Sequence, residues 1–248
     1  MRLTVLGCSA WPGPGGAASG YLVQHDGFNL LVDCGNGTLA KLQEHIEIRD
    51  IGAVLVTHAH PDHFADLYSL WVAVAFGEQA DRGIPLYAPP GFMDTVTSVS
   101  DESSSSYVHD TFSFNPVHPG GEQTVGSVTV TAFGMNHPRG AVGYRVEAGG
   151  AVLAYTGDTG PTDRVTDLAR GAGAFVCEAT FQGDPPDDYP FHLSGTQAGE
   201  YATAAGVERL VLTHLWPSND AAVTRSQAER AFDGEIVMAE SGMELEVG

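Results

Sequence analysis

Short runs of apolar and β-branched residues, each ending near a turn residue, recur along the first quarter of the chain. Such runs are typical of β-strands, and they predict strands at 3–6, 20–23, 28–32 and 53–57. Apolar residues also repeat at spacings of three and four after Gly37 and again after His63, which predicts two helices. The repeating positions are Leu39, Leu42 and Ile46 in the first helix and Phe64, Leu67, Leu70, Trp71 and Val74 in the second.

The segment 77–126 is the least regular part of this pattern. Prolines at positions 85, 89 and 90 interrupt it, and a polar run, DESSSS, occupies 101–106. We predict that this polar run is a surface loop.

The pattern becomes regular again after residue 126. It predicts strands at 128–133, 142–148, 151–155, 175–177, 210–212, 236–238 and 244–247, and Gly149-Gly150 is a hairpin signal. Ser194 and Gln197 resemble a capping box that opens a helix ending at about Ala205. Strands that alternate with helices, without a charged or proline-rich linker, predict one layered α/β domain over residues 1–248.

Composition narrows the classes of partner. The 248 residues are 43% hydrophobic, which is enough for a large core, and 11 Lys and Arg against 31 Asp and Glu give a formal charge of −20. The basic residues are scattered singly, so the chain lacks the basic stripe that binding of long nucleic acid requires. A small anion, held by a few local groups, remains compatible with this charge.

The cysteines and the N-terminus bear on the compartment. Cys8, Cys34 and Cys177 are odd in number and far apart, which suits a reducing environment better than a disulfide framework. The start of the chain is too short in apolar residues for a signal peptide, and no apolar run approaches the ~20 residues of a transmembrane helix. We expect a cytoplasmic protein with no membrane partner; a homodimer remains open.

The run His58-Ala59-His60-Pro61-Asp62-His63 is the strongest chemical feature of the sequence. By the chain's own composition, this pattern should arise by chance only about once in a thousand such chains. Imidazole and carboxylate are the side chains that bind zinc, and the run follows a predicted strand, where ligand sites of α/β proteins gather. The run therefore predicts a metal site.

Two further strands end in the same way. The strands at 53–57, 151–156 and 210–213 each end in Thr and are followed by a possible metal ligand: His58, Asp158 and His214. If these strands are neighbours in one sheet, their ligands meet at a common edge. His137, just past the strand at 128–133, is a fourth contribution; His118 also precedes a proline, but no strand delivers it.

Together these residues resemble the metallo-β-lactamase superfamily. The HxHxDH run, the later His137, Asp158 in a TGDT stretch and His214 carry the resemblance, which spans nearly the whole chain and includes Asp33 as the early structural aspartate. Glu178-Ala179-Thr180 and His192-Leu193-Ser194 are similar to the ribonuclease Z-like branch. The resemblance implies a four-layer αββα sandwich with two mixed β-sheets.

The resemblance also implies a ligand set for two divalent metal ions, with Zn²⁺ favoured and Mn²⁺ as an alternative. One ion would be held by His58, His60 and His137, the other by Asp62, His63 and His214, and Asp158 would bridge them. Two zinc ions about 3.5–4 Å apart share a hydroxide and stabilise the oxygens of a phosphoryl displacement. Asp62 would also orient that hydroxide. His192 would protonate the leaving oxygen, and Glu178 would orient its ring; Cys177 stands where the motif usually has histidine.

The missing RNA-binding arm sets the expected substrate. Ribonuclease Z enzymes typically carry a long insertion between the positions of His137 and Asp158, whereas only 20 residues separate them here. This favours a small phosphodiester, such as a cyclic nucleotide, as substrate. The alternatives are a transfer RNA 3′ endonuclease, an acyl hydrolase of lactones or β-lactams, and a ligand-binding protein that retains metal without turnover.

We expect other polar and aromatic residues near these motifs to have structural roles rather than roles in the site. His25, His45 and His109 are expected to face solvent, and Arg139 to form a surface salt bridge as readily as a phosphate contact. The acidic stretch 184–188 is interpreted as a solvated loop. The aromatic residues beside the motifs, which could stack a base, are interpreted as core or rim packing: Trp11, Phe64, Tyr189 and Trp216.

Overall fold

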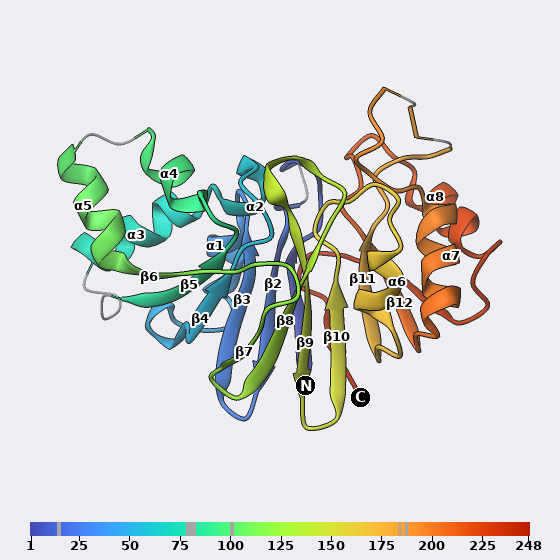
Figure 1. Cartoon of the computed structure of the whole chain (residues 1–248), viewed down its shortest axis with the longest axis horizontal. Helices are drawn as coiled ribbons and strands as arrows, with labels where there is room; N and C mark the ends of the chain where they lie inside the picture. The colour runs from blue at the N-terminus through green and yellow to red at the C-terminus, as the bar shows by residue number, and fades with distance from the viewer. Residues whose placement is uncertain (14–15, 78–82, 100–101, 184, 187) are drawn as a thin grey trace.

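The computed structural model describes the chain except residues 14–15, 78–82, 100–101, 184 and 187. Two mixed sheets stand face to face in the middle of the molecule (Figure 1). The first has the order β14 (Glu244–Glu246), β1 (Arg2–Gly7), β2 (Gly20–His25), β3 (Phe28–Cys34), β4 (Ala53–Leu55), β5 (Ile84–Ala88) and β6 (Phe112–Pro116). The second has the order β13 (Glu235–Met238), β12 (Arg209–Thr213), β11 (Ala174–Glu178), β10 (Ala151–Tyr155), β9 (Val142–Ala148), β8 (Val128–Gly134) and β7 (Glu122–Val125).

Helices cover the outer face of each sheet (Figure 1). The first sheet is covered by α1 (Thr38–Leu42), α2 (Pro61–Phe64), α3 (Leu67–Phe76), α4 (Phe92–Thr97) and α5 (Glu102–Thr111). The second is covered by α6 (Arg164–Ala169), α7 (Gly195–Ala205) and α8 (Ala221–Ala228). Short 3₁₀ turns lie at η1 (Ile48–Asp50) and η2 (Pro138–Gly140). None of the described helices is both long and apolar enough to cross a membrane.

Three buried clusters fill the spaces between these layers. One lies between the two sheets and combines residues such as Tyr21 of β2 with Tyr144 of β9, while the other two lie between a sheet and its helices. Contacts also cross between the sheets directly: the Tyr144 hydroxyl donates to the Val56 carbonyl at 2.9 Å. The layer order is helix, sheet, sheet, helix, which confirms the predicted αββα fold.

Most predicted elements appear within two residues of their predicted ends. The strands at 142–148 and 151–155 match, and Gly149 and Gly150 both have positive φ, as their hairpin turn requires. Ser194 and Gln197 form the predicted capping box of α7. The helix after Gly37 is shorter than predicted because it ends at Leu42, and the helix after His63 is divided into α2 and α3.

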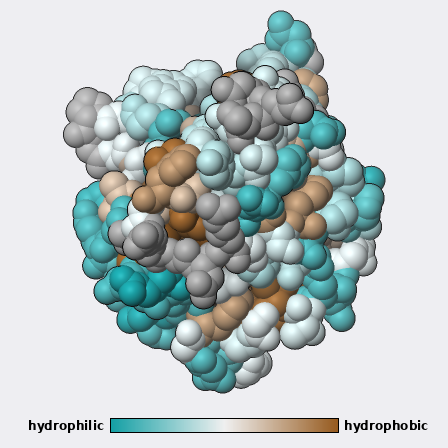
Figure 2. All heavy atoms as spheres, turned by 90° about the vertical axis from the view of Figure 1, so that its left-hand side faces the viewer, coloured by the Kyte–Doolittle hydropathy of each residue, from teal (hydrophilic) through white to brown (hydrophobic). Residues whose placement is uncertain are grey.

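The prediction of a loop at 101–106 was wrong. Residue 101 lies outside the described residues, but Glu102–Thr111 form α5. Tertiary packing overrides the poor helix propensity of the serines, because Val108 is fully buried and Tyr107 contacts Phe76 of α3 at 5.0 Å between ring centroids. Figure 2 shows this face, on which apolar residues lie among polar ones. The sequence also failed to predict β5, β6 and β7, which are short.

Candidate metal centre

The predicted ligands come together from both sheets rather than from one. The condition stated for this convergence, that the strands before His58, Asp158 and His214 are neighbours in one sheet, is not met: β4 belongs to the first sheet, and β11 separates β10 from β12 in the second. The ligands still converge, because the loops that follow these strands lie at the same edge of the sandwich, the upper one in Figure 1.

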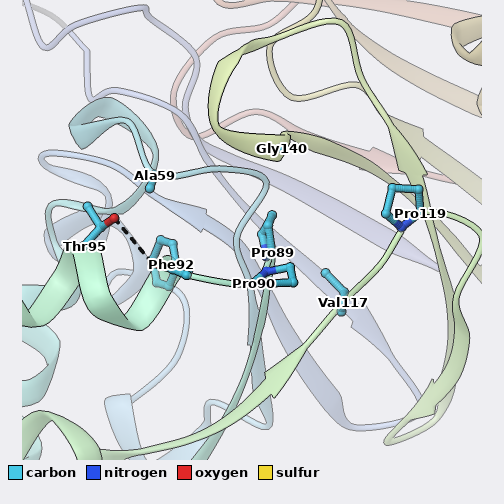
Figure 3. Close-up of a pocket in the computed structure, with 9 residues that line it drawn as sticks. Ala59, Pro89, Pro90, Phe92, Thr95, Val117, Pro119 and Gly140 are labelled. Atoms are coloured by element: carbon cyan, nitrogen blue, oxygen red, sulfur yellow. Dashed lines mark hydrogen bonds between the residues drawn. The ribbon is translucent and has the colours of Figure 1, made fainter.

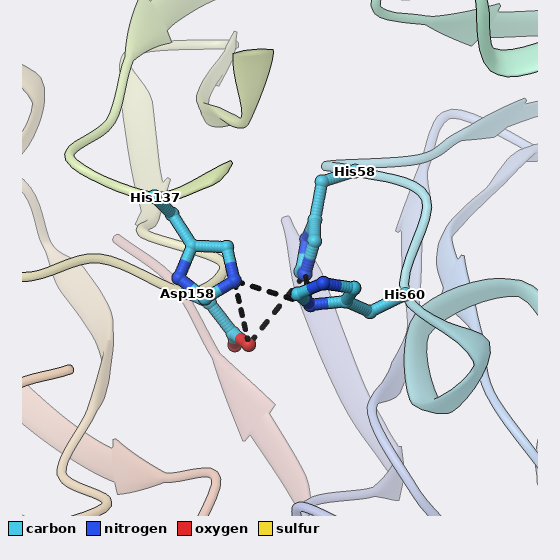
Figure 4. A group of neighbouring side chains, drawn as sticks. All are labelled: His58, His60, His137 and Asp158. Atoms are coloured by element: carbon cyan, nitrogen blue, oxygen red, sulfur yellow. Dashed lines mark hydrogen bonds and ion pairs between the residues drawn. The ribbon is translucent and has the colours of Figure 1, made fainter. Parts of the chain in front are cut away.

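One group of side chains consists of His58, His60, His137 and Asp158, whose ligand atoms lie within 4.8 Å of one another (Figure 4). His60 Nδ1 lies 3.0 Å from His58 Nε2 and 3.1 Å from His137 Nε2. Asp158 Oδ2 lies 3.6 Å from His58 Nε2 and 3.8 Å from His137 Nε2.

The second group consists of Asp62, His63, His214 and the same Asp158. Asp158 Oδ1 lies 3.1 Å from His63 Nε2 and 3.3 Å from His214 Nε2. Asp62 Oδ2 lies 3.2 Å from His214 Nε2. Asp158 thus contributes one carboxylate oxygen to each group, which is the arrangement of a bridging ligand.

Hydrogen bonds at Nδ1 hold the imidazole proton on that nitrogen and leave Nε2 of the buried histidines free to bind a metal ion. The Asp33 carboxylate accepts from His63 Nδ1 at 2.7 Å, and also from the Tyr155 hydroxyl at 2.8 Å and the Thr57 amide at 2.8 Å. Thr57 Oγ1 donates to Asp33, so it accepts from His58 Nδ1, 3.1 Å away. A neutral imidazole has one N–H, and with that proton at Nδ1 its Nε2 is a lone-pair donor for a metal.

The histidines from the second sheet are oriented in the same way. His137 Nδ1 donates to the Phe191 carbonyl at 3.0 Å. His214 Nδ1 lies 2.8 Å from Thr180 Oγ1, whose own proton goes to Glu178. Sequence reasoning gave neither the Phe191 carbonyl nor Thr180 an orienting role. The one sequence signal for the role of Thr180 was its hydroxyl, which can accept a hydrogen bond from an imidazole N–H, at a position two residues after Glu178.

These donors fit divalent cations. Ligand atoms around a tetrahedral zinc with bonds of about 2.0–2.1 Å lie about 3.3 Å apart, close to the separations in both groups. Asp158 Oδ1 is buried and accepts no hydrogen bond, so a cation would satisfy it. His58, His60, His137 and Asp158 would hold one ion, and Asp62, His63, His214 and Asp158 the other.

The electrostatics of the groups agree with this fit. Burial lowers the pKa of His58 well below its usual value, helped by the neighbouring His63, and burial also lowers the pKa of His137. Both rings are therefore neutral, as metal ligands must be. Burial alone would raise the pKa of Asp158, but protonated His214 and His63 beside it outweigh burial and lower that pKa, so the carboxylate is ionised. Burial would likewise lower the pKa of His63, but the Asp158, Asp33 and Asp62 carboxylates outweigh it and raise that pKa, so a metal ion that binds Nε2 of His63 would take the place of a proton.

Two residues of the site, Asp33 and the ligand His214, adopt unusual backbone conformations. Asp33 has φ of +56° and His214 has φ of +59°, in the left-handed region that residues other than glycine seldom occupy. In Asp33 this conformation accompanies a side chain bonded to His63 and Tyr155. Strained backbone of this kind clusters at functional sites, where the surrounding packing enforces it.

His192 and Glu178 form a pair beside the second group. His192 Nδ1 donates to Glu178 Oε1 at 2.9 Å, and the His192 ring stacks on that of His214 with centroids 5.5 Å apart. Burial would lower the pKa of His192, but the Glu178 carboxylate outweighs it and raises that pKa to about 9.

Glu178 is better suited to orienting His192 than to binding a third metal. Its ligand atoms lie near those of His192 and His214, yet its oxygens already accept from the Thr159 amide at 2.7 Å, the Thr180 hydroxyl at 2.8 Å and the Leu193 amide at 3.2 Å. Cys177 is buried among the residues that pack against the helices, so this departure from the family motif does not touch the site.

A cavity of about 500 Å³ adjoins the ligand loops (Figure 3). It is lined by Ala59, which lies between His58 and His60, by Gly140 of η2, and by Pro89, Pro90, Gly91, Phe92, Thr95, Val117 and Pro119. The lining is mainly apolar and rich in proline.

Several sequence candidates lie outside both metal groups. His118, His45 and His109 are exposed, and His25 is half-buried. Phe64 is core packing, as predicted, because it is 4% exposed and contacts Phe92. Of the acidic stretch 184–188, residues 184 and 187 lie outside the described residues.

Comparisons with known proteins identify the family. A sequence profile described as "Beta-lactamase superfamily domain" matches residues 28–215. An uncharacterised protein of Mycobacterium tuberculosis is 37% identical over 95% of this chain and 88% of its own length. A ribonuclease Z of Methanopyrus kandleri is 29% identical over 92% of this chain and 91% of its own.

A solved crystal structure supports the same family assignment. The crystal structure of the metallo-beta-lactamase fold protein YhfI from Bacillus subtilis superimposes with a TM-score of 0.88 at 28% identity, covering 100% of this chain and 98% of that one. In sequence the same protein, described as a probable metallo-hydrolase, is 29% identical over 98% of both chains. The chain described here is therefore a metallo-hydrolase of the metallo-β-lactamase superfamily, in its ribonuclease Z-like branch.

Proposed function

We propose that this chain is a phosphodiesterase that binds two divalent metal ions and cleaves a small phosphodiester, with cyclic nucleotides as the favoured class. The observation that carries the proposal is the His192–Glu178 pair, which lies against His214 at the edge of the second ligand group. A phosphodiester has an alkoxide leaving group, which needs a proton as the bond to phosphorus breaks. The ribonuclease Z similarity, at 29% identity, supports phosphodiester chemistry.

In the proposed hydrolysis, the metal ions, Asp62, His192 and Glu178 have separate roles. When bound, the two divalent cations, Zn²⁺ or alternatively Mn²⁺, supply an activated water and stabilise negative charge on the phosphate. Asp62 is the part-exposed carboxylate of the site, with 23% of its side chain accessible, so it can orient that water and accept its proton. The water oxygen bonds to phosphorus, the bond to the leaving oxygen breaks, and His192 Nε2 gives that oxygen a proton. Glu178 fixes the ring of His192 through Nδ1.

The segment between His137 and Asp158 supports the proposal of a small substrate. That segment holds η2 and the hairpin of β9 and β10, which continues the second sheet. It forms no arm, and the charge of −20 repels a long polyanion. Transfer RNA 3′ processing remains the second candidate, because the same pair of residues and the similarity to a ribonuclease Z favour it.

One assay panel tests the proposal. Zinc-loaded and manganese-loaded protein is offered a 3′,5′-cyclic nucleotide, a bis-aryl phosphodiester, a precursor transfer RNA, a lactone and a cephalosporin, with Asp62→Ala as the inactive control. We expect turnover of the cyclic nucleotide and the bis-aryl diester. Turnover of only the lactone or the cephalosporin would refute the proposal.

Two matched histidine variants test the assigned roles. His192→Ala is expected to lower turnover by about 100-fold or more while the metal content stays unchanged, since general acids contribute about 10²–10⁴. The exposed His118→Ala, outside both metal groups, is expected to change neither quantity. Loss of metal from His192→Ala would contradict its role as proton donor.

A further inference from the structure

Exposed aromatic side chains gather beside His192. The exposed large hydrophobic residues within the described part of the chain are Trp11, Val72, Phe76, Val99, Tyr189, Trp216 and Val223. Trp11, Tyr189 and Trp216 are 46%, 45% and 38% exposed, and they include every tryptophan and tyrosine in this set. The interpretation of these three residues as ordinary packing therefore leaves their exposure unexplained.

Ring contacts connect these side chains to His192 in two directions. The Tyr189 ring centroid lies 5.8 Å from that of His192. On the other side, Phe181 lies 5.8 Å from His192 and 5.7 Å from Trp216, and Trp216 lies 5.9 Å from Trp11. We call these four side chains, Trp11, Phe181, Tyr189 and Trp216, the aromatic rim.

The rim is assembled from separate loops that are tied together. Trp11 follows β1, Phe181 and Tyr189 follow β11, and Trp216 follows β12. The Ala10 amide donates to the Leu215 carbonyl at 3.2 Å, which fastens the loop of Trp11 to that of Trp216. Phe181 forms a bridge to Ser194, next to the segment of His192. Backbone contacts thus fix the loops of Trp11, Phe181 and Trp216 before any ligand arrives, which lowers the entropic cost of binding one.

We propose that the aromatic rim binds the base of a nucleoside that carries the leaving oxygen, so that the preferred substrate is a small phosphodiester of a nucleoside. The inference rests on the proposed function, because it is His192 that defines the leaving-group side. Nucleobases stack on aromatic side chains with little dependence on sequence, and such stacking is worth about five- to a hundredfold in affinity per base. A ribose whose oxygen meets His192 projects its base onto the rings that surround His192.

The cavity of Figure 3 is the competing position for the base. Its lining adjoins His58, His60 and His137, and contains no neighbour of His192 in the aromatic contacts. Phe92 supplies its one aromatic side chain, which is 2% exposed and so presents little ring face to a ligand. The rim is therefore the better stacking surface.

Titration calorimetry on the zinc-loaded full chain tests the inference. It compares adenosine 5′-monophosphate with ribose 5-phosphate, which has the same phosphate and sugar but no base. We expect Trp216→Ala and Tyr189→Ala to raise the Kd of the nucleotide by about tenfold and to leave that of ribose 5-phosphate unchanged. Trp216→Phe, which keeps a ring, should restore most of the affinity. Phe76→Ala removes a 60% exposed ring from α3 and should change neither Kd.

A cavity-filling variant and an activity assay separate the outcomes. If Thr95→Phe weakens nucleotide binding and the rim variants do not, the base lies in the cavity and the inference is overturned. If the protein hydrolyses a base-free cyclic ribose phosphate but rim variants bind nucleotide normally, the inference fails and the proposed function stands. If no phosphodiester is hydrolysed although rim variants selectively lose nucleotide affinity, the rim binds bases and the proposed function fails.

Discussion

The two sheets contribute to the metal centre in different ways. The first sheet supplies His58, His60, Asp62 and His63 from one six-residue segment that runs from the loop after β4 into α2, whereas the second supplies His137, Asp158 and His214 from three separate loops. The first contribution is local, so its spacing is visible in the sequence. The second depends on strand order and on the packing of one sheet against the other.

Different devices hold the two contributions in place. In the contribution of the first sheet, the Ser19 amide donates to the Asp62 carbonyl at 3.1 Å. Gly35 also packs against this carbonyl: a side chain at position 35 would place its Cβ 1.9 Å from the carbonyl oxygen. Only glycine permits this approach of the ligand loop to β3. In the second, Glu178 and Thr180 bind the loops of Asp158, His192 and His214 together. Single substitutions should therefore affect one contribution or the other, and only a change at Asp158, which belongs to both metal groups, should affect both metal positions directly.

The largest effect is expected for Asp158→Ala, because Asp158 belongs to both groups. Turnover should fall by more than about 100-fold, because removal of a residue that only supports a metal ligand already lowers activity by up to about 100-fold. Metal content should fall at both positions, measured by elemental analysis. The exposed Asp163→Ala is the matched control. Loss of only one metal ion would show that Asp158 serves a single group.

Asp33→Asn tests the first contribution alone. Asparagine tolerates the left-handed backbone of Asp33 but lacks the charge that fixes His63. We expect about 10–100-fold weaker binding of one metal ion, the range for outer partners of metal ligands, measured by competition with a chelator. Asp26→Asn makes the same change at an exposed residue with φ of +46° and should have no effect. Equal weakening of both ions would contradict the division into two groups.

Glu178→Gln tests the second contribution. The new amide replaces one of the two carboxylate oxygens by an NH2 group, which would face donors on either side: the Thr159 amide and His192 Nδ1 at Oε1, or the Thr180 hydroxyl and the Leu193 amide at Oε2. The neutral side chain therefore holds the ring of His192 less firmly. Turnover should fall by about tenfold, part of what a general acid contributes, with little loss of metal. Steady-state kinetics with elemental analysis checks this against the exposed Glu208→Gln. Unchanged kcat would remove Glu178 from the mechanism.

The smallest effect is expected for Tyr144→Phe, which breaks a bond between the sheets. Its hydroxyl donates to the Val56 carbonyl at 2.9 Å, and the loss should lower the free energy of unfolding by about 1 kcal/mol. Thermal denaturation would show this as a fall in Tm of about 2–4 °C. Metal content should not change; a deficit would mean that the contact between sheets positions the ligands directly.

The same contrast explains what the sequence could predict. Strands with regular apolar patterns, such as 142–148 with its alternating Val142, Tyr144, Val146 and Ala148, were predicted well, and so were ligands next to such strands. Helix α5 was not predicted because its serines have low helix propensity. The helix is stabilised instead by tertiary packing of Val108 and Tyr107 on α3. The assignment of β4 to a different sheet from β10 and β12 was missed because pairing between distant strands leaves no local pattern. Three members of the rim, Trp11, Tyr189 and Trp216, were named from the sequence as residues that could stack a base, but their gathering beside His192 could not be predicted, since they come from loops far apart in sequence.

The metal content of the purified chain decides whether the two ligand groups form a dinuclear metal centre. We predict about two divalent ions per chain after loading with zinc, loss of both from Asp158→Ala, and loss of activity on chelation that zinc or manganese restores. A chain that binds no metal ion, or that keeps full hydrolytic activity after complete chelation, would contradict this prediction.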